Sequence, residues 1–185
     1  MSAAGDILKF WFETAGPKDW FSQNDAFDSD VRAKFEFNAI EMAADISRMK
    51  THALEHSADG ALALIIALDQ FPRNMYRGTK AMFAWDGLAL SAAKRAVEKG
   101  FDYKVDQSRR AFVYMPYMHS ESLEDQNRCV DLCDARLTDE STLRHAKAHR
   151  TVIERFGRFP HRNAVLGRES TREEVEFLNS GGYAP

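Results

Sequence analysis

The chain has few of the residues that define disulfide-rich or catalytic small proteins, because only 2 of its 185 residues are cysteine and only 5 are proline. Cys129 and Cys133 lie four residues apart in a helical pattern, where a disulfide would strain the backbone. We therefore expect two reduced thiols packed in or near the core. The sequence also contains no H-E-x-x-H, no G-x-S-x-G and no glycine-rich phosphate loop, so these common catalytic motifs are excluded.

An excess of one charge and a long apolar run are missing as well. The 25 Lys and Arg residues against 28 Asp and Glu residues give a net charge of -3, which provides no global basic field for nucleic acid or anionic lipid. No apolar run approaches the roughly 20 residues of a membrane span, and the start "MSAAGDILKFWF" lacks the basic region of a signal peptide. We predict a cytoplasmic protein without nucleic-acid or membrane partners.

The residues that are present are those of a globular domain, with 44% hydrophobic and 29% charged residues. A chain of this length can bury a sizeable core, so we predict a single domain over residues 1–185. Any electrostatic recognition must then come from a local group of charges.

Apolar residues recur at helical spacing along nearly the whole chain, and no segment reads as a strand. The stretch "ADGALALIIALDQF" is apolar almost all round, which indicates a helix buried on most sides and ended by Pro72. A capping box of Ser170 and Glu173 predicts the start of the last helix. We predict an all-α fold of seven to nine helices with no sheet.

Three of the prolines share a local frame, in the pairs Phe71-Pro72, Met115-Pro116 and Phe159-Pro160. Successive members of the set are 44 residues apart, and this period holds two helices with their loops. Periods of this size are typical of helical solenoids. The spacing predicts stacked antiparallel helix pairs, a tetratricopeptide-like superhelix with degenerate repeats of about 44 residues.

If the repeat exists, the segments "FPRNMYRG", "MPYMHSE" and "FPHRNAVLG" lie on one edge of the stack. Polar side chains from distant parts of the sequence would then converge, namely Asp69, Arg73, Asn74, His119, Glu121, His161, Arg162 and Asn163. An architectural role stays open, because proline ends helices, asparagine tolerates turns and arginine bonds the last carbonyls of a helix.

Arginine is concentrated near the C-terminus. The segment from Arg150 to Arg172 contains six arginines, no lysine and two acidic residues, a local net charge of +4. The planar guanidinium suits bidentate capture of carboxylate or phosphate, which favours an anion pocket. An internal salt-bridge network with Glu121, Asp125 and Glu154 is the alternative.

The histidines provide a second kind of chemistry. His145 and His149 lie four residues apart, a spacing that helical metal sites use. His52 and His56 have the same spacing in a polar linker, so the pattern alone is weak. We predict no metal site, while histidine and glutamate near the arginines remain candidates for proton transfer.

The motifs "LDQFPRNMYRGT", "YMPYMHSESLEDQ" and "RFGRFPHRNAVLGRESTREEVEFL" resemble the three signature blocks of domain-of-unknown-function family 924, and "ILKFWF" fits its opening pattern. The resemblance implies a tetratricopeptide-like helical fold and implies no activity, cofactor or substrate. His145 has no place in the pattern, and the region from Met42 to Asp59 departs from it. The matching positions are Asp69, Gln70, Arg73, Asn74, Arg77, Gly78, His119, Glu121, Asp125, Gln126, His149, Phe156, Gly157, Arg158, Pro160, His161, Arg162, Asn163, Gly167 and Arg168.

Two functional hypotheses follow, and the sequence does not decide between them. The first is a helical-repeat protein that binds a small anion or an acidic peptide through Asp69, Arg73, Asn74, Arg77, Arg158, Arg162 and Asn163. The second is an enzyme, for instance a metal-assisted hydrolase, with catalytic candidates His119, Glu121, His149 and His161. Association with another subunit or a second copy of the chain is a third interpretation, and no cofactor is indicated.

Overall fold

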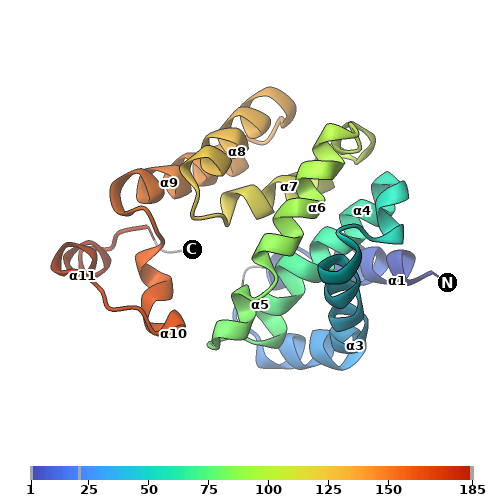
Figure 1. The fold of residues 1–185 in the computed structure, drawn as a ribbon, viewed down its shortest axis with the longest axis horizontal. Coiled ribbons are helices and arrows are strands. Elements are labelled where there is room, and N and C mark those ends of the chain that lie inside the picture. Colours follow the sequence, from blue (N-terminus) through green and yellow to red (C-terminus); the bar gives the residue numbers. More distant parts are fainter. Residues whose placement is uncertain (1, 21, 184–185) are drawn as a thin grey trace.

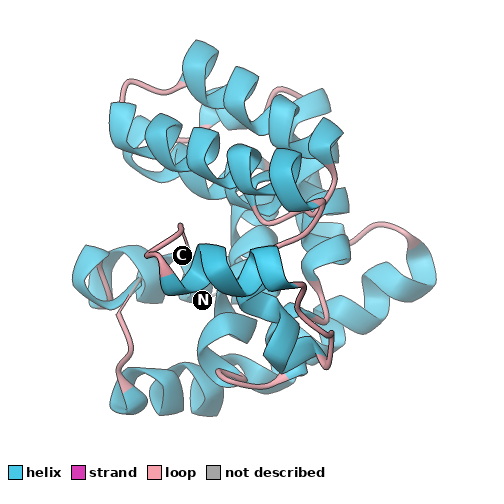
Figure 2. Cartoon of the chain, turned by 90° about the vertical axis from the view of Figure 1, so that its left-hand side faces the viewer, coloured by secondary structure: helices cyan, strands magenta, loops and turns pink. Residues whose placement is uncertain are grey.

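The structure is a computed structural model that describes residues 2–20 and 22–183. Every regular element in these residues is helical, as Figure 2 shows, and they contain no strand. The all-α prediction is therefore confirmed.

The first half of the chain contains one long helix and several shorter ones. Its elements are α1 (Ala3–Lys9), the π-helical η1 (Phe10–Thr14), α2 (Pro17–Trp20), α3 (Asp25–Met49), the 3-10 turn η2 (Ala53–His56), α4 (Ala58–Ile65), the π-helical η3 (Ile66–Gln70), α5 (Phe71–Met75), the 3-10 turn η4 (Lys80–Phe83) and α6 (Asp86–Glu98). The second half contains η5 (Asp102–Lys104), α7 (Gln107–Met118), α8 (Leu123–Arg136), α9 (Glu140–Phe156), η6 (Pro160–Arg162), α10 (Asn163–Leu166) and α11 (Arg172–Asn179).

The number of helical segments is higher than predicted. The described residues contain eleven α-helical segments against the seven to nine expected. The difference arises because single turns such as α2 and α10 leave no periodic pattern in the sequence, and because π turns divide helices that the sequence presents as continuous.

The prediction that Pro72 ends a helix is wrong. The chain passes from α4 through η3 into α5, and Pro72 lies in the first turn of α5. A proline ring crowds the carbonyl four residues earlier, so a helix continues past it only with a local change of register. The π turn provides that change, since the Phe71 amide bonds the Ile66 carbonyl five residues back.

The three prolines of the 44-residue frame therefore occupy unlike backbone positions. Pro116 lies inside α7, whereas Pro160 opens a 3-10 turn after the extended residue Phe159. Neither matches Pro72 at the start of α5. The equal spacing of the prolines does not correspond to a repeated local structure.

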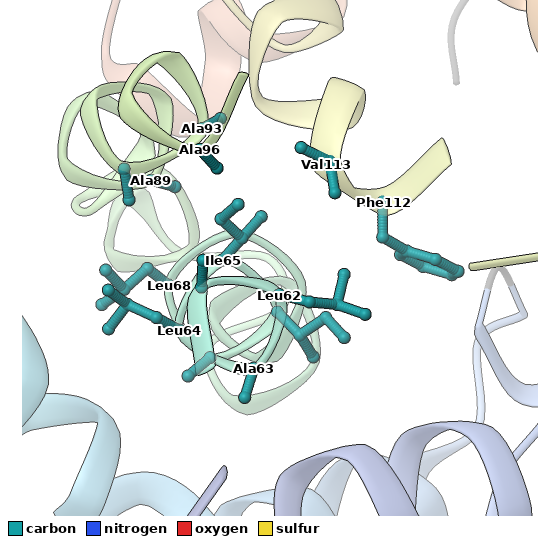
Figure 3. Packing of buried hydrophobic residues seen from close by; sticks show 14 of the residues in the cluster. Leu62, Ala63, Leu64, Ile65, Leu68, Ala89, Ala93, Ala96, Phe112 and Val113 are labelled. Atoms are coloured by element: carbon teal, nitrogen blue, oxygen red, sulfur yellow. The ribbon is translucent and has the colours of Figure 1, made fainter. Parts of the chain in front are cut away.

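The core is built around α4, as predicted from its apolar sequence. All residues from 61 to 68 are at most 2% exposed. In Figure 3 the side chains of this segment point in several directions, toward the alanines of α6 on one side and toward Phe112 and Val113 of α7 on another. The small Ala89, Ala93 and Ala96 are buried on α6, where they leave room for the larger side chains of α4.

The C-terminal elements form a separate small core. Val152, Ile153 and Phe159 are buried together, with Phe177 of α11 packed against them. In Figure 1, α9, α10 and α11 lie on one side of the molecule, and α3 to α6 on the other. Contacts of α8 with both α7 and α9 join the two parts along the chain.

Two further sequence predictions can be compared with the structure. Cys129 and Cys133 are buried free thiols, as expected. The last helix has a capping box, but it consists of Thr171 and Glu174 rather than Ser170 and Glu173, one residue later than predicted. No helix in the described residues is long and apolar enough to cross a membrane.

Candidate functional site

The two copies of the Phe-Pro motif meet at the carboxylate of Asp86, the first residue of α6. Arg73 of α5 binds it with both terminal nitrogens, Nη1 to Oδ1 at 2.9 Å and Nη2 to Oδ2 at 3.1 Å. Arg162 of η6 reaches Oδ2 through Nη1 at 3.4 Å. Arg73 and Arg162, two members of the predicted set that are far apart in the sequence, thus meet at an aspartate that was not in that set.

Arg73 is well supplied with acceptors. Besides the two bonds to Asp86, its Nη1 donates to the Asp69 carbonyl at 2.7 Å and lies 3.5 Å from the Met82 carbonyl. Nη1 also lies 3.9 Å from the Asp69 carboxylate. The guanidinium of Arg73 is thereby fixed by the fold itself.

Arg162 is not supplied in the same way. A guanidinium has five N–H donors, yet the 3.4 Å contact with Asp86 is the one hydrogen bond that the Arg162 side chain makes within the described residues, and its buried Nε has no partner. The side chain is 8% exposed. Burial, with the nearby charge of Arg73, lowers the pKa of Arg162 to about 10.

Aromatic rings hold the Arg162 guanidinium in place. Its central carbon lies 4.6 Å from the ring centre of Phe83 and 4.5 Å from that of Phe159. Cations are attracted to the faces of aromatic rings, and this contact leaves the N–H donors at the edge of the guanidinium available.

The fully buried Asp69 lies in the π turn η3 and bonds His119, at the end of α7. The distance from Asp69 Oδ1 to His119 Nδ1 is 2.8 Å, and Gln70 Nε2 also donates to the carboxylate. Burial raises the pKa of Asp69, but His119 and Arg73 hold it below its ordinary value. An ionised carboxylate only accepts hydrogen bonds, so the proton lies on His119 Nδ1 and the lone pair on Nε2.

The neighbouring histidines are neutral near pH 7. Burial and the positive charge of Arg73 lower the pKa of His119. Burial lowers the pKa of His149 to about 3, and its Nδ1 donates to the His145 carbonyl at 2.9 Å. Burial together with Arg162 lowers the pKa of His161 to about 4, and the buried Nδ1 of His161 has no partner.

Glu121 positions the loop that leads into η6. It accepts from both terminal nitrogens of Arg168, at 2.7 and 2.9 Å, and from the backbone N–H of Phe159 at 2.8 Å. Burial raises the pKa of Glu121, but the bonds from Arg168 and Phe159 hold it below its ordinary value. With these three bonds, Glu121 is an ionised acceptor that fixes Phe159 beneath Arg162.

Four of the predicted ligand-binding residues have partners elsewhere in the fold. Asn74 and Arg77 bind Asp28 of α3, the asparagine at 2.8 Å and the arginine at 2.6 and 3.0 Å. At the other motif, Arg158 binds Glu174 at 2.6 and 2.8 Å, and Asn163 bonds Ser170 and Glu174 at 3.0 and 3.2 Å. These side chains hold α3 against α5 and the loop of η6 against α11.

The arginine-rich segment is largely an internal network, the alternative that the sequence left open. Glu121 and Glu154 take part as predicted, whereas Asp125 pairs with Lys94 and not with an arginine. Five of its six arginines have a carboxylate within 3.2 Å, in the pairs Arg150–Glu154, Arg155–Glu173, Arg158–Glu174, Arg168–Glu121 and Arg172–Glu176. The 3.4 Å contact of Arg162 with Asp86 is the longest of the six. The candidate anion site is thereby narrowed from a segment to one guanidinium.

Sequence reasoning missed the residues that complete this cluster. Neither Asp86 nor Phe83 was among the predicted site residues. An acidic residue in the first turn of a helix is ordinary, and nothing in the sequence indicates that it receives two arginines. Among the described residues, no group of three or more His, Cys, Asp or Glu side chains is placed to hold a metal ion.

Comparison with known proteins places the chain in a family. A model described as a bacterial protein of unknown function, DUF924, matches residues 7–182. The chain belongs to this family. It is similar to the solved structure of a protein of unknown function from Agrobacterium tumefaciens, with 40% identity over 96% of this chain and 97% of the other and a TM-score of 0.88. No curated protein matches the chain.

The family assignment confirms the resemblance seen in the sequence blocks. The DUF924 match spans both Phe-Pro motifs and His119, so the whole Arg162 cluster lies within the family region.

Proposed function

We propose that the chain is a tetratricopeptide-like binding protein that holds a small anion, a carboxylate or a phosphate, at the edge of the Arg162 guanidinium. The observation that carries the proposal is the poor hydrogen bonding of this buried cation. A buried charged group without acceptors is costly, and buried polar groups in proteins are almost always paired. An anionic ligand would provide the missing acceptors.

The surroundings of Arg162 favour an anion over a neutral ligand. Asp86 shares its charge between two arginines, because Arg73 already occupies both of its oxygens. A carboxylate or phosphate can accept two parallel bonds from one guanidinium. The contacts with Phe83 and Phe159 fix the guanidinium before the ligand arrives, which reduces the entropic cost of binding.

The low exposure of Arg162 favours a small ligand over an acidic peptide. Exposed arginines such as Arg172 already pair with glutamates on their own helix. The consecutive packing of α6 on α7, α7 on α8 and α8 on α9 supports the stacked helical architecture that we propose for the binding protein.

A thermal-shift titration with phosphate, acetate, succinate and an acidic peptide tests this function. A ligand at 100 times its dissociation constant adds about 2.7 kcal/mol to the free energy of unfolding. We expect at least one small anion to stabilise the wild type and to have no effect on Arg162→Gln. Arg172→Gln is the matched control, because it removes the same charge from a side chain that is 93% exposed.

Equal stabilisation of wild type and both variants would mean general salt effects and would overturn the proposal. Stabilisation by the peptide alone would assign the site to a protein partner. No stabilisation by any of the anions would leave Arg162 as a structural residue.

A further inference from the structure

The Asp69–His119 pair is not needed for the anion binding proposed above. Its carboxylate lies 2.8 Å from Nδ1 of His119, no described residue partners Nε2, and the His119 side chain is 16% exposed. In hydrolases a buried carboxylate on Nδ1 holds the imidazole in the tautomer that accepts a proton at Nε2. The pair therefore has the geometry of a general base and its positioning residue.

The position of Asp69 in the backbone supports this interpretation. It lies in the π turn η3, and π turns within helices occur frequently at functional sites. The side chain is fully buried, and besides His119 it accepts from its neighbour Gln70. A carboxylate buried to this extent holds His119 in one orientation.

A row of ring contacts connects His119 with Arg162. The His119 ring is 6.4 Å from the ring of His149, which is 5.6 Å from the ring of Phe159. Phe159 in turn is in contact with the Arg162 guanidinium. A molecule bound at Arg162 would have to extend along this row of rings to reach His119.

Two candidate nucleophiles, the Ser120 hydroxyl and the Cys129 thiol, are not available. Ser120 Oγ donates to Asp125 at 2.8 Å. Cys129 is fully buried, and contact with Cys133 and burial raise its pKa, so it stays a thiol. Water is then the group that His119 can deprotonate.

We propose that the chain hydrolyses a small ester that bears a carboxylate, with Arg162 holding the carboxylate, His119 as general base and Asp69 as its positioning residue. This inference rests on the anion binding proposed above. One under-coordinated guanidinium suits a single carboxylate, whereas a transferring phosphoryl group spreads charge over three equatorial oxygens.

The reaction needs water and the ester alone. His119 Nε2 accepts a proton from water while the water oxygen bonds to the ester carbonyl carbon. The tetrahedral intermediate then loses the alkoxide, which takes the proton from Nε2 as the C–O bond breaks. The products are a carboxylic acid and an alcohol, and His119 returns to its starting state.

The test compares hydrolysis of the 4-nitrophenyl monoester of succinate with that of 4-nitrophenyl acetate. We expect the wild type to prefer the succinate ester and His119→Gln to lose at least about 100-fold in kcat/KM, since a general base contributes 10²- to 10⁴-fold. Arg162→Gln should raise KM for the succinate ester and erase the preference. His56→Gln, which changes an exposed histidine, controls for hydrolysis by surface imidazoles.

Asp69 is tested as a positioning residue by a readout that a packing defect would not change. In ¹⁵N-labelled wild type, we expect NMR to find the proton of His119 on Nδ1, and Asp69→Asn should move it toward Nε2. If Asp69→Asn does not fold, the wild-type tautomer alone decides: a proton on Nε2 contradicts the dyad.

The two proposals fail separately. If a folded His119→Gln hydrolyses the ester as fast as His56→Gln, or if the wild type does not exceed buffer, the dyad is not a hydrolytic base. Anion binding stands in that case if succinate still stabilises the wild type and not Arg162→Gln. Loss of both results overturns both proposals.

Discussion

The two Phe-Pro motifs share phenylalanine, proline, arginine and asparagine, but they differ in backbone conformation and in the hydrogen bonds of their arginines. In Phe71-Pro72-Arg73-Asn74 the backbone is a continuous helix, and Arg73 has the acceptors it needs. The second motif, residues 159–163, opens with an extended residue and turns through η6, and its Arg162 has one long hydrogen bond.

The backbone explains the difference. His161 is inserted between Pro160 and Arg162, so the arginine of the second motif is one residue further from its proline than Arg73 is from Pro72. In a 3-10 turn of three residues this displacement re-aims the side chain. The two motifs therefore lie close together, but the surrounding residues satisfy the hydrogen bonds of Arg73 and not those of Arg162.

The largest expected effect concerns Arg73, the arginine with satisfied hydrogen bonds. Arg73→Met should lower the free energy of unfolding by about 3 to 5 kcal/mol, because Asp86 and the buried Asp69 lose a charged partner. Chemical denaturation measures the loss. The exposed Arg172→Met should change stability by less than about 0.5 kcal/mol. A loss below about 1 kcal/mol for Arg73→Met would show that the ion pairs of Arg73 with Asp86 and Asp69 do not stabilise the fold.

The next effect depends on pH and concerns the carboxylate that holds the second motif. The bond from Arg158, with those from Thr171 and Asn163, lowers the pKa of Glu174 to about 2 despite burial. A lowered folded pKa contributes stability above the ordinary pKa of about 4.3, and this contribution is lost as the pH falls toward 2. Glu174→Gln should therefore cost about 3 kcal/mol at pH 7 and less than about 1 kcal/mol at pH 2.5.

Denaturation of wild type and Glu174→Gln between pH 7 and 2.5 gives this comparison. Glu176→Gln, whose partner Arg172 is exposed, is the control and should show little pH dependence. A difference between wild type and Glu174→Gln that does not shrink with falling pH would mean that Glu174 acts through packing and not through its charge.

Much of the architecture was predictable from the sequence because it depends on local apolar patterns. The all-round apolar character of "ALALIIAL" predicted the central buried helix, and the recurrence of apolar residues at helical spacing predicted the absence of a sheet in the described residues. The passage through Pro72 was not predictable in this way. A π turn depends on a register shift in the backbone that no residue type signals.

The sequence predicted part of the candidate site, namely Arg73 and Arg162, but neither Asp86 and Phe83 nor the hydrogen bonds. Arginine content indicated an anion pocket, yet most of these arginines pair with glutamates of α11, α9 or the loop after α7. Which arginine is left over depends on the placement of Asp86 and Phe83, residues with ordinary local roles. The number of acceptors around a buried guanidinium depends on the tertiary fold, so the spacing of residues in the sequence does not reveal it.

A smaller effect concerns the entry into the second motif. Gly157 ends α9 with φ of 67°, a left-handed conformation in which a Cβ would meet no other atom. Gly157→Ala should thus cost about 1 kcal/mol through the backbone alone. Gly87→Ala is the matched control, because Gly87 lies in α6 with open space and no positive φ, and alanine there should stabilise by about 0.5 kcal/mol. Equal changes in the free energy of unfolding for Gly157→Ala and Gly87→Ala would show that the backbone at residue 157 accommodates an alanine without strain.

The smallest expected effect on stability is at Arg162, the arginine with few hydrogen bonds, and it tests the comparison of the two motifs most directly. Arg162→Met removes a buried charge that has one long hydrogen bond, and methionine can keep the contacts with Phe83 and Phe159. The lost attraction to Asp86 is offset by relief of the unpaired Nε and of the repulsion from Arg73. We expect a change within about 1 kcal/mol, of either sign, in the anion-free protein by chemical denaturation. A loss as large as that of Arg73→Met would mean that Arg162 stabilises the fold as Arg73 does. The two motifs would then differ in backbone conformation but not in role.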